Sequence, residues 1–528
     1  MTDLEIARSV PIVNIKDIAR KIGLTDDDLV LYGSKMAKIN RVYKDKVGKL
    51  ILVTAINPTP YGEGKTTVSI GLGDALNSIG KGVCITLRQP SMGPVFGIKG
   101  GATGGGRSQI IPMENINLHF TGDFHAITSA NNLLSAAIDN HIFHGNELDI
   151  QKVIFNRCMD VNDRALRNIA ISGRDDSFCI TAASEIMALF CLADSLDDLK
   201  NRLSNIVIGY NSKGEMIYAK DLNIQGALTV ILKDAFKPNL VQTLEHTPVI
   251  LHGGPFANIA HGCNSVVATK LALSFSDYVV TEAGFGADLG AEKFFDIKCR
   301  VADLKPDCVV LVATVKALKY NGKNNELIDG LSNLKRHIEN LRKYGVNIVV
   351  CLNKYAADTD FEIKTVVDYC NKMNVCCEVS SSYVDGGTGA ISLASKVVEL
   401  CDSSSNFKLL YKDNESIRNK IRTICCEIYR ATDVTYSDLA NKKIDYLEQN
   451  NIRNLPICVA KTQYSFSDNA KKLGAPVDFI VHVRDVQLYN GAGFITIFLG
   501  NIMTMPGLPA KPNYGHIDFV DGKIIGIS

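Results

Sequence analysis

The sequence contains no tryptophan, no long apolar run and no cluster of basic residues. Without tryptophan, tyrosine and phenylalanine are the residues left that offer a large ring for stacking on a flat heterocycle. No stretch approaches the roughly 18 apolar residues of a membrane-spanning helix, and the acidic start at residues 1–5 lacks the apolar core of a signal peptide. The net charge of +1 gives no indication of nucleic-acid binding. We therefore expect a cytoplasmic protein that binds neither membranes nor nucleic acid.

Motifs that indicate a zinc site or a common hydrolase are absent as well. The 15 cysteines are scattered, and the adjacent pairs Cys376-Cys377 and Cys425-Cys426 do not have the spacing of a zinc clip. His252 and His261 lie in glycine-rich segments without metal-binding spacing, so each either donates to an anion or is a hydrogen-bonded structural residue. No G-x-S-x-G elbow or kinase signature occurs. We expect reduced cysteines and no structural zinc.

The strongest motif is a strand–loop–helix unit at residues 50–76. Residues 50–56 have the length and β-branched content of a buried strand, and Pro58 and Pro60 end it. The segment Gly62-Glu63-Gly64-Lys65-Thr66-Thr67 follows and leads into a helical stretch at 68–76. Glycines allow the backbone to approach phosphate oxygens, and a helix N-terminus offers free N–H groups. The unit therefore predicts a phosphate-binding loop.

Two side chains of this loop have positions suited to a nucleotide. Lys65 would reach the outer phosphates, and Thr66 would help to hold Mg²⁺. Thr59 stands where the standard pattern has its first glycine, so the loop is a variant. The alternative is an ordinary strand-to-helix turn with a surface lysine, which the complete strand–loop–helix context disfavours.

Other short apolar segments predict further strands of a parallel sheet. They cover residues 81–87, 248–251, 278–281, 308–313 and 347–352, with helical segments at 126–138 and 331–341 among them. This alternation predicts an α/β fold with a large P-loop-containing parallel-sheet domain and two smaller α/β domains. The expected boundaries are 1–335, 336–460 and 461–528. Residues 1–49 are predicted to form a helical leader, with an amphipathic helix over 24–43.

The loops at the carboxyl ends of these strands hold the other candidate residues, because ligands of parallel sheets bind there. Arg88 ends the strand at 81–87, which we place next to the phosphate-loop strand. Its guanidinium would bind an anion, or it is a surface arginine. Glu282 and Asp288 either reach Mg²⁺ or are solvated loop carboxylates. Phe285 either stacks on a purine or fills the core.

Two tyrosines lie at the tips of later loops. Tyr355 follows the strand at 347–352, and Tyr383 precedes a glycine-rich turn. Aromatic rings at two loop tips could sandwich a flat heterocycle, although surface tyrosines are common. Asn353-Lys354 is followed by Ala356 where guanine recognition needs aspartate, so a GTPase is disfavoured.

Longer stretches of the sequence resemble formate–tetrahydrofolate ligase, also called 10-formyltetrahydrofolate synthetase. The similarity covers nearly the whole chain. It is carried by residues 59–67 (TPYGEGKTT), 90–102 (PSMGPVFGIKGGA), 117–123 (NLHFTGD), 237–245 (KPNLVQTLE), 252–263, 281–300, 460–465 and 502–509. Runs of this length are far more specific than the phosphate-loop pattern. No room is left for a fused dehydrogenase or cyclohydrolase domain, so we expect a monofunctional enzyme.

The resemblance implies an ATP-dependent C–N ligase. Formate would attack the γ-phosphate to give formyl phosphate, and N10 of tetrahydrofolate would then attack the formyl carbon and release phosphate. It also implies Mg²⁺, activation by a monovalent cation (K⁺ or NH₄⁺), and a homodimer or homotetramer. On this basis Lys65 and Arg88 are catalytic, and Tyr355 and Tyr383 bind the folate. The residues expected to bind ATP or its phosphates are Thr59, Pro60, Gly62, Glu63, Gly64, Lys65, Thr66, Thr67, Ala257 and Phe285.

The chain departs from the family pattern in three places. Gln89 stands where glutamate is typical, but the arginine before it is kept. Tyr355 and Tyr383 match the positions of a phenylalanine and a tryptophan that sandwich the pterin, and tyrosine offers less stacking area than tryptophan. We therefore expect weaker or altered folate binding. Lys316 replaces a typical arginine, and residues 321–323 replace His-Gly-Gly.

Two other classes of function fit the residues. The first is another ATP-dependent carboxylate-activating ligase, similar to dethiobiotin synthetase, whose ADP release would not depend on tetrahydrofolate. The second is a non-catalytic folate- or nucleotide-binding protein, which the substituted aromatic pair suggests and which would bind ATP without turnover.

Overall fold

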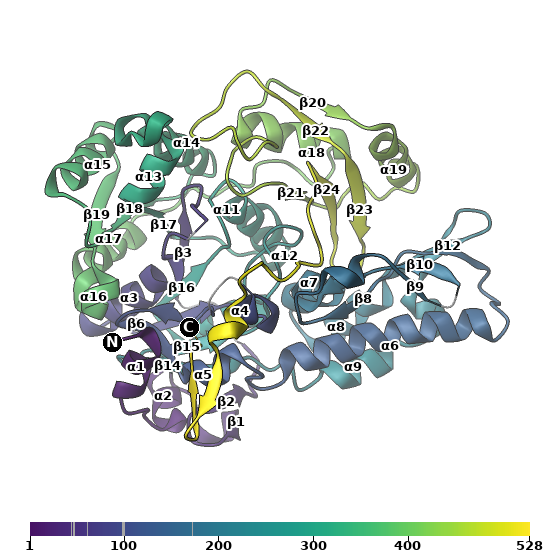
Figure 1. Cartoon of the computed structure of the whole chain (residues 1–528), viewed down its shortest axis with the longest axis horizontal. Helices are drawn as coiled ribbons and strands as arrows, with labels where there is room; N and C mark the ends of the chain where they lie inside the picture. The colour runs from purple at the N-terminus through teal and green to yellow at the C-terminus, as the bar shows by residue number, and fades with distance from the viewer. Residues whose placement is uncertain (44, 46–47, 61, 98–100, 172, 528) are drawn as a thin grey trace.

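The computed structural model describes every residue of the chain except 44, 46–47, 61, 98–100, 172 and 528. Tyr61 of the expected phosphate loop and Lys99 of the glycine-rich segment therefore lie outside the described residues. The chain forms an α/β structure around one large, mainly parallel sheet, as the sequence predicts (Figure 1). In the described part of the chain, no helix combines the length and apolar character needed to cross a lipid bilayer.

The central sheet has 12 strands, and its parallel part contains the strands predicted from the sequence. Their order is β15 (Pro248–Leu251), β4 (Val83–Leu87), β16 (Tyr278–Glu282), β3 (Lys49–Ala55), β17 (Cys308–Ala313), β18 (Ile348–Asn353) and β19 (Cys376–Ser380). Every neighbouring pair in this series is parallel. The carboxyl ends of these strands consequently meet at one edge of the sheet, where a ligand site is expected.

The predicted neighbour relation between β3 and β4 is wrong. β16 lies between them and pairs with both. A crossover of a much later segment thus separates two strands that follow one another in the sequence. Arg88, at the end of β4, is two strands away from the phosphate loop, and Glu282, at the end of β16, stands between the two.

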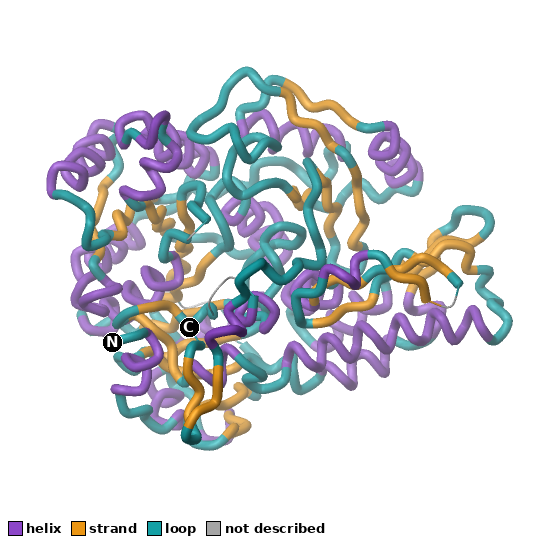
Figure 2. The backbone as a smooth tube through the Cα atoms, in the orientation of Figure 1, coloured by secondary structure: helices purple, strands orange, loops and turns teal. Residues whose placement is uncertain are grey.

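Helices cover both faces of the parallel sheet, because its strands are apolar on both sides (Figure 2). In β3, Leu50 and Leu52 pack into one core, whereas Ile51 and Val53 pack into the other. The helices that line the first core include α10 (Val266–Phe275) and α14 (Leu327–Lys343), and those that line the second include α3 (Lys65–Ser78) and α17 (Ile391–Asp402). α14 confirms the amphipathic helix predicted around residues 331–341.

The predicted helix over residues 24–43 is wrong. The leader does begin with helices, α1 (Asp3–Ser9) and α2 (Ile15–Lys21), but β1 (Leu29–Tyr32) and β2 (Met36–Ile39) then form an antiparallel hairpin. β2 is buried throughout and pairs with β14 (Asn239–Thr243), which extends the central sheet. This long-range pairing outweighs the local helical pattern, because helix propensity is only a weak preference per residue.

Two parts of the chain flank the central sheet (Figure 1). α6 (Asp123–Phe143) extends away from the sheet, and α9 (Gln225–Leu232) packs along α6. The C-terminal part contains a small sheet in which β24 (Phe494–Phe498) lies between β21 (Ile457–Ala460) and β23 (Asp485–Tyr489). β18 and β19, which follow the expected boundary at residue 335, belong to the central sheet. The division of the chain into domains at residues 335 and 460 stays a prediction.

Candidate active site

The loop between β3 and α3 has the form of a phosphate cradle. Gly64 is the N-cap of α3 and has a left-handed conformation with φ of +70°. A Cβ atom at Gly64 would lie 2.5 Å from the side-chain nitrogen of Asn353, so both the conformation and the space require glycine. Lys65, Thr66 and Thr67 form the first turn of α3, and the N-terminal end of a helix favours an anion.

Glu63 braces this loop from within. Its carboxylate accepts a hydrogen bond of 2.7 Å from the backbone N–H of Thr59 and one of 2.6 Å from the hydroxyl of Thr314. The side chain is buried, and burial raises the pKa of its carboxyl group. Asn353 donates to the Glu63 carbonyl oxygen at 3.2 Å. Glu63 therefore holds the loop in shape with both its side chain and its backbone carbonyl group.

Two side-chain oxygen groups that could hold Mg²⁺ meet at the start of α3. The Thr66 hydroxyl donates a 2.9 Å hydrogen bond to the buried carboxylate of Glu282, which ends the neighbouring strand β16. A hydroxyl and a carboxylate beside a phosphate loop are the donors that Mg²⁺ prefers. Asp288 does not join them, because its carboxylate is ion-paired with Lys461 at 2.7 Å. Among the described residues, no group of three or more His, Cys, Asp or Glu side chains could hold a metal ion.

Arg88 lies at the same edge of the sheet with hydrogen-bonding capacity to spare. Its Nη1 donates to the carbonyl oxygen of Pro255 at 3.3 Å, whereas its Nε is buried and has no partner in the described structure. A Cβ atom at Gly284 would lie 3.2 Å from both Nη atoms and 2.6 Å from the Cβ of Ala257. The guanidinium therefore rests against the loops that carry Gly284 and Ala257, and both loops must approach it closely.

Two buried lysines hold the loop that contains Ala257. Lys293 donates to the Ala257 carbonyl oxygen at 2.6 Å, and Lys298 donates to the Asn264 carbonyl oxygen at 2.9 Å. Lys298 lies in a π-helical turn, Phe294–Cys299, a type of turn that occurs frequently at functional sites. Burial lowers the pKa of Lys298 to about 8. These ammonium groups fix the loop that contains Ala257.

The two histidines have different surroundings, and neither contacts a metal-ligand cluster in the described structure. His252 is a structural residue, because Nδ1 bonds to the Ser265 hydroxyl at 2.7 Å and Nε2 to the Ala235 carbonyl oxygen at 2.9 Å. His261 is fully buried, and within the described chain neither ring nitrogen has a hydrogen-bond partner. Burial, then the charges of Lys298, Lys293 and Arg88, lower the pKa of His261, so it is neutral.

The remaining nucleotide candidates surround the loop. Pro60 is exposed, Thr59 is buried beneath it, and Gly62 has φ of +83°. Phe285 is half-buried and has φ of +60°, which is strained for an aromatic residue. Such strain persists where the surroundings enforce it and is frequent in ligand sites. Phe285 lies in the loop that follows β16 at the carboxyl-end edge of the sheet, and not in the sheet itself.

The predicted stacking pair is partly exposed, with 41% of Tyr355 and 51% of Tyr383 accessible to solvent. The Tyr355 hydroxyl would lie 4.0 Å from a Cβ atom at Gly64, so this ring adjoins the phosphate loop. Burial, followed by the nearby charges of Glu63 and Asp358, raises the pKa of Tyr355 to about 12. The Tyr383 hydroxyl contacts Asp3 at 3.3 Å. Tyr355 and Tyr383 follow the carboxyl ends of β18 and β19, which are parallel to β3, so both lie at the sheet edge that carries the phosphate loop.

Sequence reasoning missed several residues that shape this site. Thr314 and Asn353 lie in strand-end loops where the chemistry is expected, but the sequence assigns no role to them or to Lys293 and Lys298. Each of the four reaches the loops through contacts between distant segments. Thr314 directly follows β17, so its place at a strand end was the one available signal. Lysines in an apolar helical stretch were a weaker signal.

The family model described as formate–tetrahydrofolate ligase matches residues 1–528, which is the whole chain.

Proposed function

The chain belongs to the formate–tetrahydrofolate ligase family, and from this premise we propose that it activates formate as formyl phosphate. The family joins formate to tetrahydrofolate with ATP to give 10-formyltetrahydrofolate. The observation that carries the proposal is the guanidinium of Arg88, whose buried Nε has no partner in the described structure and which lies at the phosphate-loop edge of the sheet. An unsatisfied donor at the same sheet edge as a phosphate cradle suits a small anion.

Two steps account for the reaction. An oxygen of formate attacks the γ-phosphorus, and the bond to the β-phosphate oxygen breaks, which releases ADP and leaves formyl phosphate. N10 of tetrahydrofolate then attacks the formyl carbon and loses its proton. The C–O bond breaks, and phosphate departs with the oxygen that came from formate.

Positioning and fixed positive charge supply the catalysis in this proposal. Lys65 and the N–H groups of the first turn of α3 hold the outer phosphates at the sheet edge where Arg88 also lies. Arg88 holds formate and then the negative charge of formyl phosphate, which it stabilises most strongly while charge develops. Lys293 and Lys298 keep the neighbouring loop in place.

We further propose that Thr66 and Glu282 hold Mg²⁺, whose charge offsets that of the phosphates when it is bound. Their hydrogen bond of 2.9 Å brings two oxygen donors together at the cradle. Activation by K⁺ or NH₄⁺ also follows from the family resemblance. Turnover measured with each cation in turn, and with none, tests that requirement.

The folate is proposed to bind between Tyr355 and Tyr383. Support comes from the exposed faces of both rings and from the closeness of Tyr355 to Gly64, which would bring N10 to the side of the cradle. Stacking on a tyrosine contributes about 1 kcal/mol beyond the buried area.

A coupled assay for 10-formyltetrahydrofolate tests the proposed function, with ATP, formate and tetrahydrofolate omitted in turn. Arg88→Ala should lower turnover at least 100-fold while the Kd for ATP stays within two-fold. Arg88→Lys should recover little, because an ammonium cannot offer a bidentate fork. Turnover of Arg88→Ala within five-fold of the natural protein would refute the role of Arg88.

A further inference from the structure

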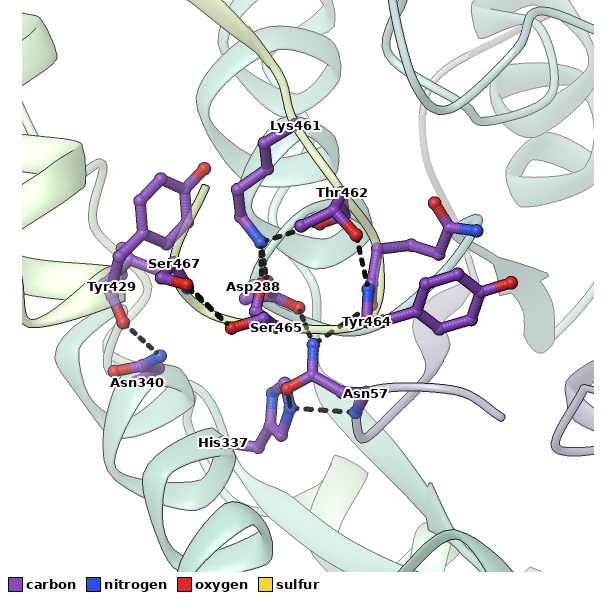
Figure 3. Close-up of polar contacts among 12 residues, drawn as sticks. Asn57, Asp288, His337, Asn340, Tyr429, Lys461, Thr462, Tyr464, Ser465 and Ser467 are labelled. Carbon is purple, nitrogen blue, oxygen red and sulfur yellow. Dashed lines mark hydrogen bonds and ion pairs between the residues drawn. The ribbon is translucent and has the colours of Figure 1, made fainter. Parts of the chain in front are cut away.

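A buried ion pair connects the C-terminal part of the chain to the loop that follows β16 (Figure 3). Lys461 directly follows β21, and its ammonium lies 2.7 Å from the carboxylate of Asp288. Neither side chain is accessible to solvent. Lys461 also donates to the carbonyl oxygens of Thr462, at 3.1 Å, and Ser465. The ammonium therefore has partners for all three of its protons.

The second oxygen of Asp288 is bound to Asn57, the second residue after β3. Asn57 Nδ2 donates to Asp288 Oδ1 at 3.1 Å and to the Gln463 carbonyl oxygen at 3.3 Å. Its Oδ1 accepts from Asn333 Nδ2 at 2.8 Å. The Asn57 amide is thus held from three directions, and the carboxylate of Asp288 on one side and the amide donor of Asn333 on the other fix which way it points.

The backbone of Asn57 is held as well. Its N–H donates to Nε2 of His337 at 3.0 Å, and its carbonyl oxygen accepts from Asn321 Nδ2 at 3.2 Å. Figure 3 shows Asn57 between His337, which projects from α14, and the segment that carries Lys461, Thr462 and Ser465. Asn57 stands two residues before Thr59, whose N–H binds Glu63. The exit of β3 is consequently fixed in position before the phosphate loop begins.

A buried ion pair is a costly way to stabilise a fold, because desolvation of two charges offsets much of their attraction. Apolar residues of similar volume often do as well for stability. We infer that the charges here serve to orient the side chain of Asn57. Asp288 is held by Lys461, and it passes that constraint to the amide of Asn57 through a charge-assisted hydrogen bond.

We propose that Lys461 and Asp288 are positioning residues for the nucleotide, which act by fixing Asn57 and with it the phosphate loop. The C-terminal segment after β21 therefore sets the affinity for ATP, although it lies outside the strand–loop–helix unit. This inference rests on the proposed function in one respect, that the loop binds ATP.

Lys461→Met tests the inference, with Lys38→Met as a matched control. Lys38 forms a buried ion pair with Asp123, also at 2.7 Å, with exposed fractions of 2% and 1%. Lys38 lies on β2, and β14, β15, β4 and β16 separate β2 from β3. Both variants remove one ammonium group and leave one buried carboxylate without its ion-pair partner, so both should lower the midpoint of thermal unfolding. They should differ in nucleotide binding.

The readouts are the Kd for ATP by calorimetry and the KM for each substrate of the full-length protein. Lys461→Met should raise the Kd for ATP at least ten-fold and leave the KM for tetrahydrofolate within two-fold. Lys38→Met should leave both within two-fold. A Kd for ATP that is unchanged in Lys461→Met, or raised equally in Lys38→Met, would overturn the inference.

Asn57→Ser covers the case in which Lys461→Met does not fold. It keeps Asp288 and Lys461 paired and removes the amide contacts, so a ten-fold rise in the Kd for ATP supports the inference and an unchanged Kd refutes it. The ligase proposal is tested independently of these results. If the natural protein binds ATP but forms no 10-formyltetrahydrofolate, the ligase mechanism is wrong while the positioning role can still hold.

Discussion

Replacing Gly64 with alanine should damage the phosphate loop far more than its small size suggests. Gly64 has φ of +70° at the N-cap of α3. An alanine in a left-handed conformation costs roughly 1–2 kcal/mol. The added Cβ would lie 2.5 Å from Asn353 Nδ2, a separation that real Cβ contacts do not tolerate. Either the loop or Asn353 must move.

The movement should cost the hydrogen bond from Asn353 to the Glu63 carbonyl oxygen, which is 3.2 Å long. A typical hydrogen bond contributes about 0.5–1.5 kcal/mol to stability. Together with the backbone strain, the loss of unfolding free energy should be about 1.5–3.5 kcal/mol. Because the displaced atoms border the first turn of α3, the KM for ATP should rise at least ten-fold.

Gly80→Ala separates the cost of backbone strain from the effect of the close contact with Asn353. Gly80 follows the other end of α3, has φ of +79°, and has no atom within 4 Å of its added Cβ. Urea unfolding should show a loss of about 1–2 kcal/mol for Gly80→Ala, with an unchanged KM for ATP. If Gly64→Ala kept the KM for ATP within two-fold of the natural protein, the loop would not be the phosphate cradle.

Two further predictions concern the folate site and the pH dependence of stability. Tyr355→Ala and Tyr383→Ala should each raise the KM for tetrahydrofolate about five-fold through lost stacking and leave the Kd for ATP within two-fold; an equal effect on both ligands would contradict the assignment. Burial raises the pKa of Glu185 from 4.5 to about 8, so the folded protein keeps a proton that the unfolded chain loses, and stability should fall between pH 4.5 and about 8 by up to roughly 1.4 kcal/mol per pH unit. Glu185→Gln keeps an oxygen for the Gly491 N–H and should remove this part of the decline in urea unfolding at pH 6 and 8, whereas parallel declines in both proteins would refute it.

The local elements of the fold could be predicted because their patterns are strong. The β-branched runs that became β3, β17 and β18 are buried on both faces, and the glycines and prolines after β3 mark its end. Residues 24–43 misled the prediction because charged and apolar residues at near-helical spacing also fit a hairpin at a sheet edge. Only the pairing of β2 with β14 decides between them.

The arrangement of the site was less predictable, because it depends on contacts between distant segments. Arg88 and the phosphate loop were expected at the same edge of the sheet, but nothing local to either strand indicates that β16 lies between them. For Asp288 the sequence left two alternatives, a ligand of Mg²⁺ or a solvated loop carboxylate, and the structure shows neither. Its ion pair with Lys461 is formed by a residue from the far end of the chain.

Transfer of oxygen from formate to phosphate tests the central claim most directly. The enzyme is supplied with ATP, tetrahydrofolate and formate labelled with ¹⁸O at both oxygens, and the released phosphate is analysed by mass spectrometry. Activation through formyl phosphate predicts one ¹⁸O in each phosphate, in step with 10-formyltetrahydrofolate. Phosphate without ¹⁸O, accompanied by the same amount of 10-formyltetrahydrofolate, would contradict the mechanism.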